Sequence, residues 1–190
     1  MRIRTLTAVH LLGCCLLTAA STFSLAQAAP AKPAVGSAIA PAQVYGSLLS
    51  SIEKEFVGAA EAMPEDKYSF APAATMGEFK GVRTFAAQVK HVTEANDYFF
   101  HDPSKPPVDN RKEIDALTTK ADILKALNDS FAQAHAYIDA ITPENAFIQT
   151  ASGTRAGQAS LGIAHMLDHY GQMVEYLRMN GIVPPASRGN

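Results

Sequence analysis

The sequence predicts an all-α protein built as a four-helix bundle. In four segments, apolar residues recur every three or four positions, which is the spacing of one face of a helix. Capping residues, proline or glycine bound these segments, and no segment alternates polar and apolar residues as a half-buried strand does. Four helices that each carry one apolar face bury those faces most economically against one another.

The first two predicted helices cover about residues 42–62 and 82–100. Pro64 stops the first, and the Pro-containing stretch 102–109 cannot continue the second. The residues of the first helix expected to face the core are Val44, Leu48, Ile52 and Phe56. The equivalent residues of the second helix are Phe85, Val89, Val92 and Phe99.

The third and fourth predicted helices begin at Thr119 and at about Gly157. Thr119 and Asp122 have the spacing of a capping box, and Pro143 ends the third helix. Its expected core face contains Ile123, Leu127, Phe131, Ala134 and Ile138. The fourth helix runs to Asn180, where Asn-Gly stops it, and its apolar stripe is Met166, Tyr170, Met173 and Leu177. The connections before the second and third helices are long, so a simple up-down-up-down order is not required.

Residues 1–28 are predicted to be a secretory signal peptide. Arg2 and Arg4 form a basic start, an apolar uncharged run follows, and Ala26-Gln27-Ala28 fits an A-x-A cleavage signal. The apolar run is too short for a membrane-spanning helix, so no stable membrane insertion is expected after cleavage. Export predicts a periplasmic or secreted protein. Lipoprotein processing at Cys14 is the alternative, although its 13-residue leader is shorter than the usual leader of roughly 15–30 residues.

Cleavage after Ala28 changes which functions the composition permits. It removes Cys14 and Cys15, the only two cysteines, which excludes a cysteine hydrolase, a thiolate zinc site and a c-type haem protein. It also removes two of the 16 basic residues and leaves 14 against 18 acidic ones, a net charge of −4. That charge, with no basic run, argues against nucleic acid as a partner.

The mature chain is predicted to contain one domain. Residues 29–41 are rich in alanine and proline and predict a flexible leader. Residues 42–187 contain no internal repeat and no second boundary, so they are expected to form the single four-helix bundle.

Two histidines of the fourth helix suggest a metal site. His165 and His169 lie four residues apart, which places them about 40° apart around the helix and about 6 Å apart along it. Gln172 and Tyr176 continue the same stripe beside the apolar one. The spacing alone is a weak signal, because two partly exposed surface histidines would look the same.

His91 is the best third ligand in the sequence. It lies mid-helix between Val89 and Val92, where the second helix is expected to pack inward. Three histidines from two facing helices would leave coordination positions open on a divalent metal. A lone histidine at such a position is also compatible with an ordinary core role.

The other histidines have simpler interpretations. His10 leaves with the signal peptide, His135 has no partner at metal-ligand spacing, and His101 can meet the carbonyl groups at the end of the second helix. Glu94 and Asp168 each follow a predicted ligand by three residues and are the candidate catalytic carboxylates. Either could orient an imidazole or accept a proton, although a solvated surface charge is the commoner role.

The stretches "HVTEANDYFF" and "AHMLDHYGQMVEYLRMNGIVPPAS", with the approach segment "MPEDKYSFAPAATMGEFKGVRTFAAQVKH", resemble the DinB superfamily of DinB/YfiT-like metalloenzymes. The similarity extends over roughly residues 42–187. It implies up-down-down-up connectivity and a divalent metal, often zinc or nickel, held by His91, His165 and His169. Family members often pair as homodimers. Many have Arg after the last histidine, where this chain has Tyr170.

The resemblance implies an activity only in outline. Characterised relatives include transferases in which the metal activates the sulfur of a low-molecular-weight thiol. This chain is expected to be exported, where such thiols are scarce, so a metal-dependent hydrolase is equally open. Non-catalytic binding of a metal or ligand in the cell envelope is the alternative, and a bundle with incidental histidines is a third. Zinc, nickel and iron all suit three histidines.

Overall fold

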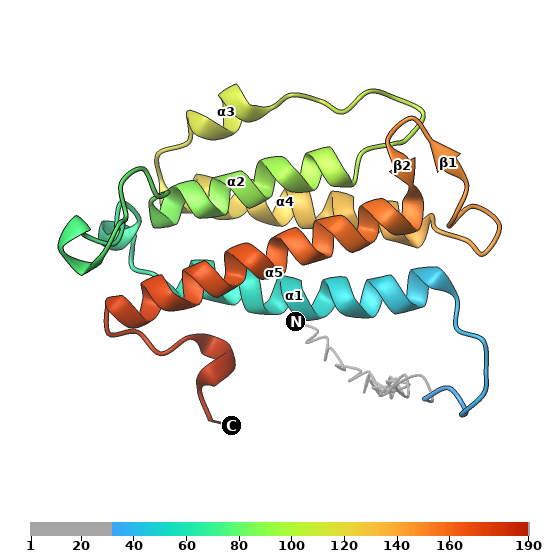
Figure 1. The fold of residues 1–190 in the computed structure, drawn as a ribbon, viewed down its shortest axis with the longest axis horizontal. Coiled ribbons are helices and arrows are strands. Elements are labelled where there is room, and N and C mark those ends of the chain that lie inside the picture. Colours follow the sequence, from blue (N-terminus) through green and yellow to red (C-terminus); the bar gives the residue numbers. More distant parts are fainter. Residues whose placement is uncertain (1–31, 190) are drawn as a thin grey trace, which may run out of the picture. The chain divides into compact units, whose positions relative to one another are not determined.

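The computed structural model describes residues 32–189, and the predicted signal peptide lies outside them. Four long helices account for most of the described chain: α1 Pro41–Ala62, α2 Phe85–Phe99, α4 Lys120–Asp139 and α5 Arg155–Met179 (Figure 1). The shorter elements are helix α3 Arg111–Asp115, three 3₁₀ turns at Glu65–Lys67, Ala74–Met76 and Pro185–Ser187, and the hairpin strands β1 Gln149–Thr150 and β2 Gly153–Thr154. The predicted all-α class is confirmed.

The long helices form a ring in which each packs on two others. α1 contacts α4 and α5, and α2 contacts the same two helices from the other side. Contacts at the helix ends give the directions. Tyr45 near the start of α1 bonds Ser160 near the start of α5, so these two run parallel, whereas Lys120 at the start of α4 bonds the carbonyl of Met63 at the end of α1. Figure 1 shows α2 and α4 running opposite to α1 and α5.

The segment between α2 and α4 crosses the length of the bundle. It leaves α2 after Phe99, passes along the outside through α3 and enters α4 at the opposite end (Figure 1). The sequence predicted a long connection here but not helix α3, and the small hairpin of β1 and β2 before α5 was not predicted either. Both features are short, and two-residue strands are too brief to show an alternating pattern.

Threonine residues set where three of the helices begin. The side-chain oxygens of Thr84, Thr119 and Thr154 accept hydrogen bonds from backbone N–H groups three residues later, which satisfies donors left free in the first turn. The capping role of Thr119 was predicted. Thr84 and Thr154 were not, so the predicted second helix began too early at 82 and the fourth too late at 157. The third helix ends at Asp139, before the predicted stop at Pro143.

The core contains most of the predicted apolar stripes, with one correction. All five residues expected on the core face of α4 are buried, but Val44 and Leu48 of α1 are 44% and 50% exposed. The buried residues of α1 are Leu49, Ile52, Phe56, Ala59 and Ala60. An i, i+4 row drifts about 40° around the helix at each step, so a stripe extended back from Ile52 leaves the core face. Phe99 and Tyr170 are only partly buried and pack against the core.

Within residues 32–189, no helix combines the length and the apolar character needed to cross a bilayer.

Two glycines of α5 should respond oppositely to alanine. A Cβ on Gly162 would lie 2.5 Å from Cζ of Phe100, a ring that is 2% exposed and cannot move aside, whereas a Cβ on Gly171 meets nothing within 4 Å. We expect Gly162→Ala to lower the free energy of unfolding by about 1–3 kcal/mol through overpacking. Gly171→Ala should raise it by up to about 1 kcal/mol through helix propensity. Urea denaturation measures both, and equal changes in the two variants would contradict the close packing at Phe100.

Candidate metal centre

The structure brings the three histidines of the predicted site together between α2 and α5. These helices are antiparallel, so His91 in the first half of α2 faces the middle of α5. Nε2 of His165 lies 3.2 Å from Nε2 of His91 and 3.2 Å from Nε2 of His169. All three ligand atoms lie within 4.8 Å of one another, and the group could hold a metal ion.

Burial keeps the three imidazoles in the form that binds metal. His169 is 5% exposed, and His91 and His165 are half-buried. Loss of hydration lowers the pKa of His91 to about 4, with smaller contributions from Arg83 and His165. It lowers the pKa of His169 to about 4 as well, and it lowers that of His165. At neutral pH all three are therefore uncharged, with lone pairs available for coordination.

The arrangement of the nitrogens suits a cation. Nδ1 of His169 lies 2.7 Å from Oε1 of Gln88. An amide oxygen only accepts hydrogen bonds, so this contact favours the tautomer of His169 that has its proton on Nδ1 and a lone pair on Nε2. Within the described chain, the buried Nδ1 atom of His165 has no hydrogen-bond partner. Nε2 atoms that converge at 3.2 Å repel one another unless a proton or a cation lies between them. Neutral imidazoles are good ligands for zinc, nickel and iron, so the donor set fits a divalent transition metal.

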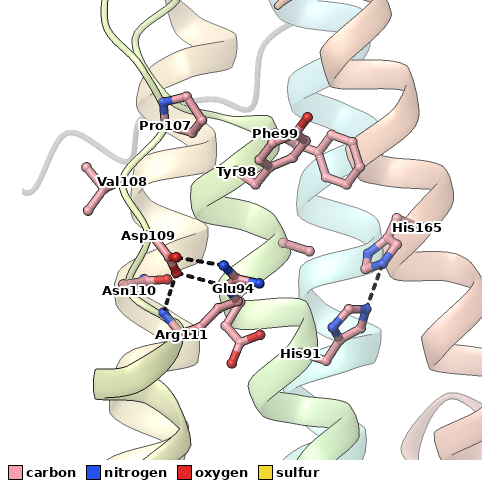
Figure 2. Close-up of a pocket in the computed structure, with 11 residues that line it drawn as sticks. His91, Glu94, Tyr98, Phe99, Pro107, Val108, Asp109, Asn110, Arg111 and His165 are labelled. Atoms are coloured by element: carbon pink, nitrogen blue, oxygen red, sulfur yellow. Dashed lines mark hydrogen bonds and ion pairs between the residues drawn. The ribbon is translucent and has the colours of Figure 1, made fainter.

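A cavity of about 520 Å³ borders the cluster. Figure 2 shows His91 and His165 on one side of it and the segment Pro107–Arg111 of the α2–α4 connection on the other, with Glu94 between them. Tyr98, Phe99, Pro107 and Val108 give the cavity an apolar wall. Two of the three histidines are thus reachable by a small molecule.

The two candidate carboxylates lie in different places. Glu94 lines the cavity beside His91, and burial, with Asp115 next, raises the pKa of its carboxyl group above the ordinary value. Asp168 is exposed and does not line the cavity. Its Oδ2 accepts a hydrogen bond from Nε2 of Gln172 at 3.2 Å. Glu94 is therefore the carboxylate placed to meet a bound molecule.

The remaining described histidines lie outside the cluster. Nε2 of His135 on α4 lies 2.7 Å from Oε2 of Glu53 on α1, so this residue links two helices. Nδ1 of His101 lies 2.7 Å from the carbonyl of Tyr98 in the last turn of α2, as expected for a histidine at a helix end, and its Nε2 lies 3.0 Å from Oγ of Ser152. His91 was preferred to His135 in the sequence, and the structure places only His91 beside His165.

Gln88 and the far wall of the cavity were not among the site residues predicted from the sequence. Gln88 lies three residues before His91, is 2% exposed and contacts His169. A polar residue next to the apolar position Val89 was the available signal. Asp109, Asn110 and Arg111 belong to the crossing connection, where two hydrogen bonds between Arg111 and Asp109, of 2.8 and 2.6 Å, join two residues that line the cavity. No local pattern assigns such a segment to a site.

In the metal-free protein, the free energy of unfolding is expected to rise as the pH increases from about 4 to about 6.5. In the unfolded chain, histidine side chains bind protons below their ordinary pKa near 6.5. In the folded protein, the pKa of His91 and of His169 is lowered to about 4, so these two side chains bind protons only below about pH 4. The unfolded state therefore binds more protons in this interval, and acid favours it. Urea denaturation at stepped pH with a chelator measures the slope. His91→Gln should make it shallower, and an unchanged slope would contradict the burial effect.

Comparison with known protein families agrees with the geometry of the site. A family model described as the DinB superfamily matches residues 48–173, a range that includes all three histidines, Gln88, Glu94 and the cavity wall. The match extends over more than half of the 190-residue chain. No curated protein matches the chain at a significant level. The chain is a member of the DinB superfamily.

Proposed function

We propose that this protein is an exported, metal-dependent enzyme of the DinB superfamily, a hydrolase or a thiol S-transferase. In this proposal His91, His165 and His169 hold one divalent ion, zinc or nickel in the first place and iron as a further candidate. The observation that carries it is the convergence of three neutral imidazoles at the wall of a cavity large enough for a small molecule.

The chemistry follows from the ligand set. A divalent ion held by three histidines keeps open positions and lowers the pKa of a water molecule or thiol that occupies one of them. The chain's own residues do the rest. The apolar wall of the cavity receives the apolar part of a substrate and reduces the access of bulk water; it consists of Tyr98, Phe99, Pro107 and Val108. Glu94, with its raised pKa, accepts a proton from the nucleophile and returns it to the leaving group.

Water is the preferred nucleophile because of the proposed export. Low-molecular-weight thiols are concentrated in the cytosol, and a periplasmic or secreted protein meets few of them. Among the described residues that line the cavity, Glu94 and Asp109 are acidic and Arg111 is the one guanidinium, which is paired with Asp109. On the part of the wall away from the metal ion, these acidic side chains would disfavour the carboxylates of a polyanionic thiol, whereas a neutral ester or amide carries no charge that they would repel.

Metal content is the first test. The full-length chain, expressed with its own N-terminus and purified without tag or chelator, should contain close to one divalent ion per molecule. His91→Ala and His165→Ala should lose it, because two imidazoles from a single helix or one from each cannot complete the site. His135→Ala is the matched control and should keep it, since His135 pairs with Glu53 away from the cluster.

The same preparation tests export, because a processed mass beginning at Ala29 is expected. Failure of the wild-type chain to take up metal, even after dialysis against zinc or nickel, would contradict the proposed function. Metal that persists in His91→Ala and His165→Ala would place the site elsewhere.

Glu94→Gln should separate metal binding from turnover. Glu94 lines the cavity but is not one of the clustered ligands, so the variant should retain its metal. Loss of a general base or acid should lower kcat by about 10²–10⁴-fold. The rate is measured on esters and amides first, then with added thiols, and the exposed Glu175→Gln serves as control. Equal rates in Glu94→Gln and the control would remove Glu94 from the mechanism, and metal without turnover in the wild type would favour a binding protein.

A further inference from the structure

A continuous row of hydrogen bonds joins the surface of α5 to His169. Nε2 of Gln172 donates to Oδ2 of Asp168 at 3.2 Å, and Nε2 of Gln88 donates to Oε1 of Gln172 at 2.7 Å. Oε1 of Gln88 then lies 2.7 Å from Nδ1 of His169. The row begins at an exposed carboxylate and ends at a histidine that is 5% exposed.

The carboxylate at one end sets the direction of every bond in the row. Ionised carboxylate oxygens only accept, so Gln172 presents its NH₂ group to Asp168 and its oxygen to Gln88. Gln88 must then use its NH₂ group toward Gln172, and its oxygen faces His169. That oxygen can be satisfied only if Nδ1 of His169 carries the proton.

The reversed row has a specific cost. With both amides turned over, the oxygen of Gln172 would face Oδ2 of Asp168 across 3.2 Å, and two acceptors would repel each other. The NH₂ group of Gln88 would then donate to Nδ1 of His169, and the histidine proton would move to Nε2. A proton on Nε2 would point toward Nε2 of His165, 3.2 Å away, and block coordination by His169.

Burial makes the choice between the two arrangements matter. Gln88 is 2% exposed, so water cannot replace either partner, and the orientation of its amide must match Gln172 on one side and the tautomer of His169 on the other. Gln88 also contacts both His169 and Gln172 from the opposite helix, so it joins α2 to α5 beside the cluster.

We propose that Asp168, Gln172 and Gln88 are positioning residues that fix the Nδ1–H tautomer of His169 and so hold its Nε2 ready for a metal ion. The proposal rests on the metal site proposed above and assigns to Asp168 a role that acts through two amides, in place of direct participation in the reaction. Groups that hydrogen-bond to the far nitrogen of a ligating histidine commonly change metal affinity by about 10- to 100-fold when they are replaced.

The test measures the tautomer and zinc affinity separately on the processed full chain. Long-range ¹H–¹⁵N NMR of the metal-free protein reports which nitrogen of His169 is protonated, and competition with a chromophoric chelator gives the zinc affinity. Three variants are compared with the wild type: Gln88→Leu, Asp168→Lys and, as the control, Glu175→Lys. Asp168→Lys places a donor at the end of the row, while Glu175→Lys makes the same charge change elsewhere on the exposed face of α5.

The wild type and Glu175→Lys should show His169 protonated on Nδ1. Asp168→Lys should shift His169 toward the Nε2–H form and weaken zinc binding relative to Glu175→Lys. Gln88→Leu should weaken zinc binding about 10- to 100-fold. If Gln88→Leu fails to fold, the exposed Asp168→Lys still decides the question. An Nδ1–H tautomer and an unchanged zinc affinity in Asp168→Lys would overturn the proposal.

The two proposals fail in different ways. A wild-type chain that binds neither zinc nor nickel would overturn the metal site, and the row of hydrogen bonds would then be judged on the metal-free tautomer alone. A change of tautomer in Asp168→Lys but not in Glu175→Lys would support the positioning role in that case, and no change would overturn it.

Discussion

The antiparallel packing of α2 against α5 is the constraint on which the rest of the site depends. It sets His91 opposite His165 and His169 and removes all three rings from most of the surrounding water. Loss of hydration disfavours the charged imidazolium, so the same contact that closes the core also keeps the ligands neutral. The packing of α2 on α5 therefore both stabilises the fold and keeps the three imidazoles in the neutral form that binds a metal ion.

The crossing connection between α2 and α4 turns the histidine cluster into one wall of a cavity. Two contacts hold this segment against α2: Nδ2 of Asn110 donates to Asp97, and Nζ of Lys90 donates to the carbonyl of Asp115 at 2.9 Å. Asn110 belongs to the cavity wall and Asp115 to α3, so these two hydrogen bonds hold both parts of the segment against the helix that carries His91. Because α2 and α4 run in the same direction, the connection between them must cross the length of the bundle and is long enough to cover the site.

The carboxylate of Asp168 lies at the edge of the site, and two hydrogen-bonded amide side chains connect it to the buried histidine. Asp168 lies in solvent, where an ionised carboxylate keeps its hydration. Gln172 and Gln88 form the hydrogen bonds that link this acceptor to the buried His169. Placing the carboxylate itself beside His169 would have required burial of a charge. Two neutral amides therefore achieve the orientation of a ligand that many metal sites obtain from a direct carboxylate contact.

The sequence by itself determined what depends on the period of a single helix. The core face of α4 and the shared side of His165 and His169 follow from 3.6 residues per turn within one helix. The cap at Thr119 is local as well, because its side chain bonds the backbone N–H group three residues later. The tertiary structure decided where along α1 the drifting apolar row leaves the core, and it left Val44 and Leu48 exposed. It likewise decided that Gln88 meets His169 and that residues 107–111 close the cavity. These contacts depend on the register between packed helices and on the path of a crossing segment, and no local spacing specifies either.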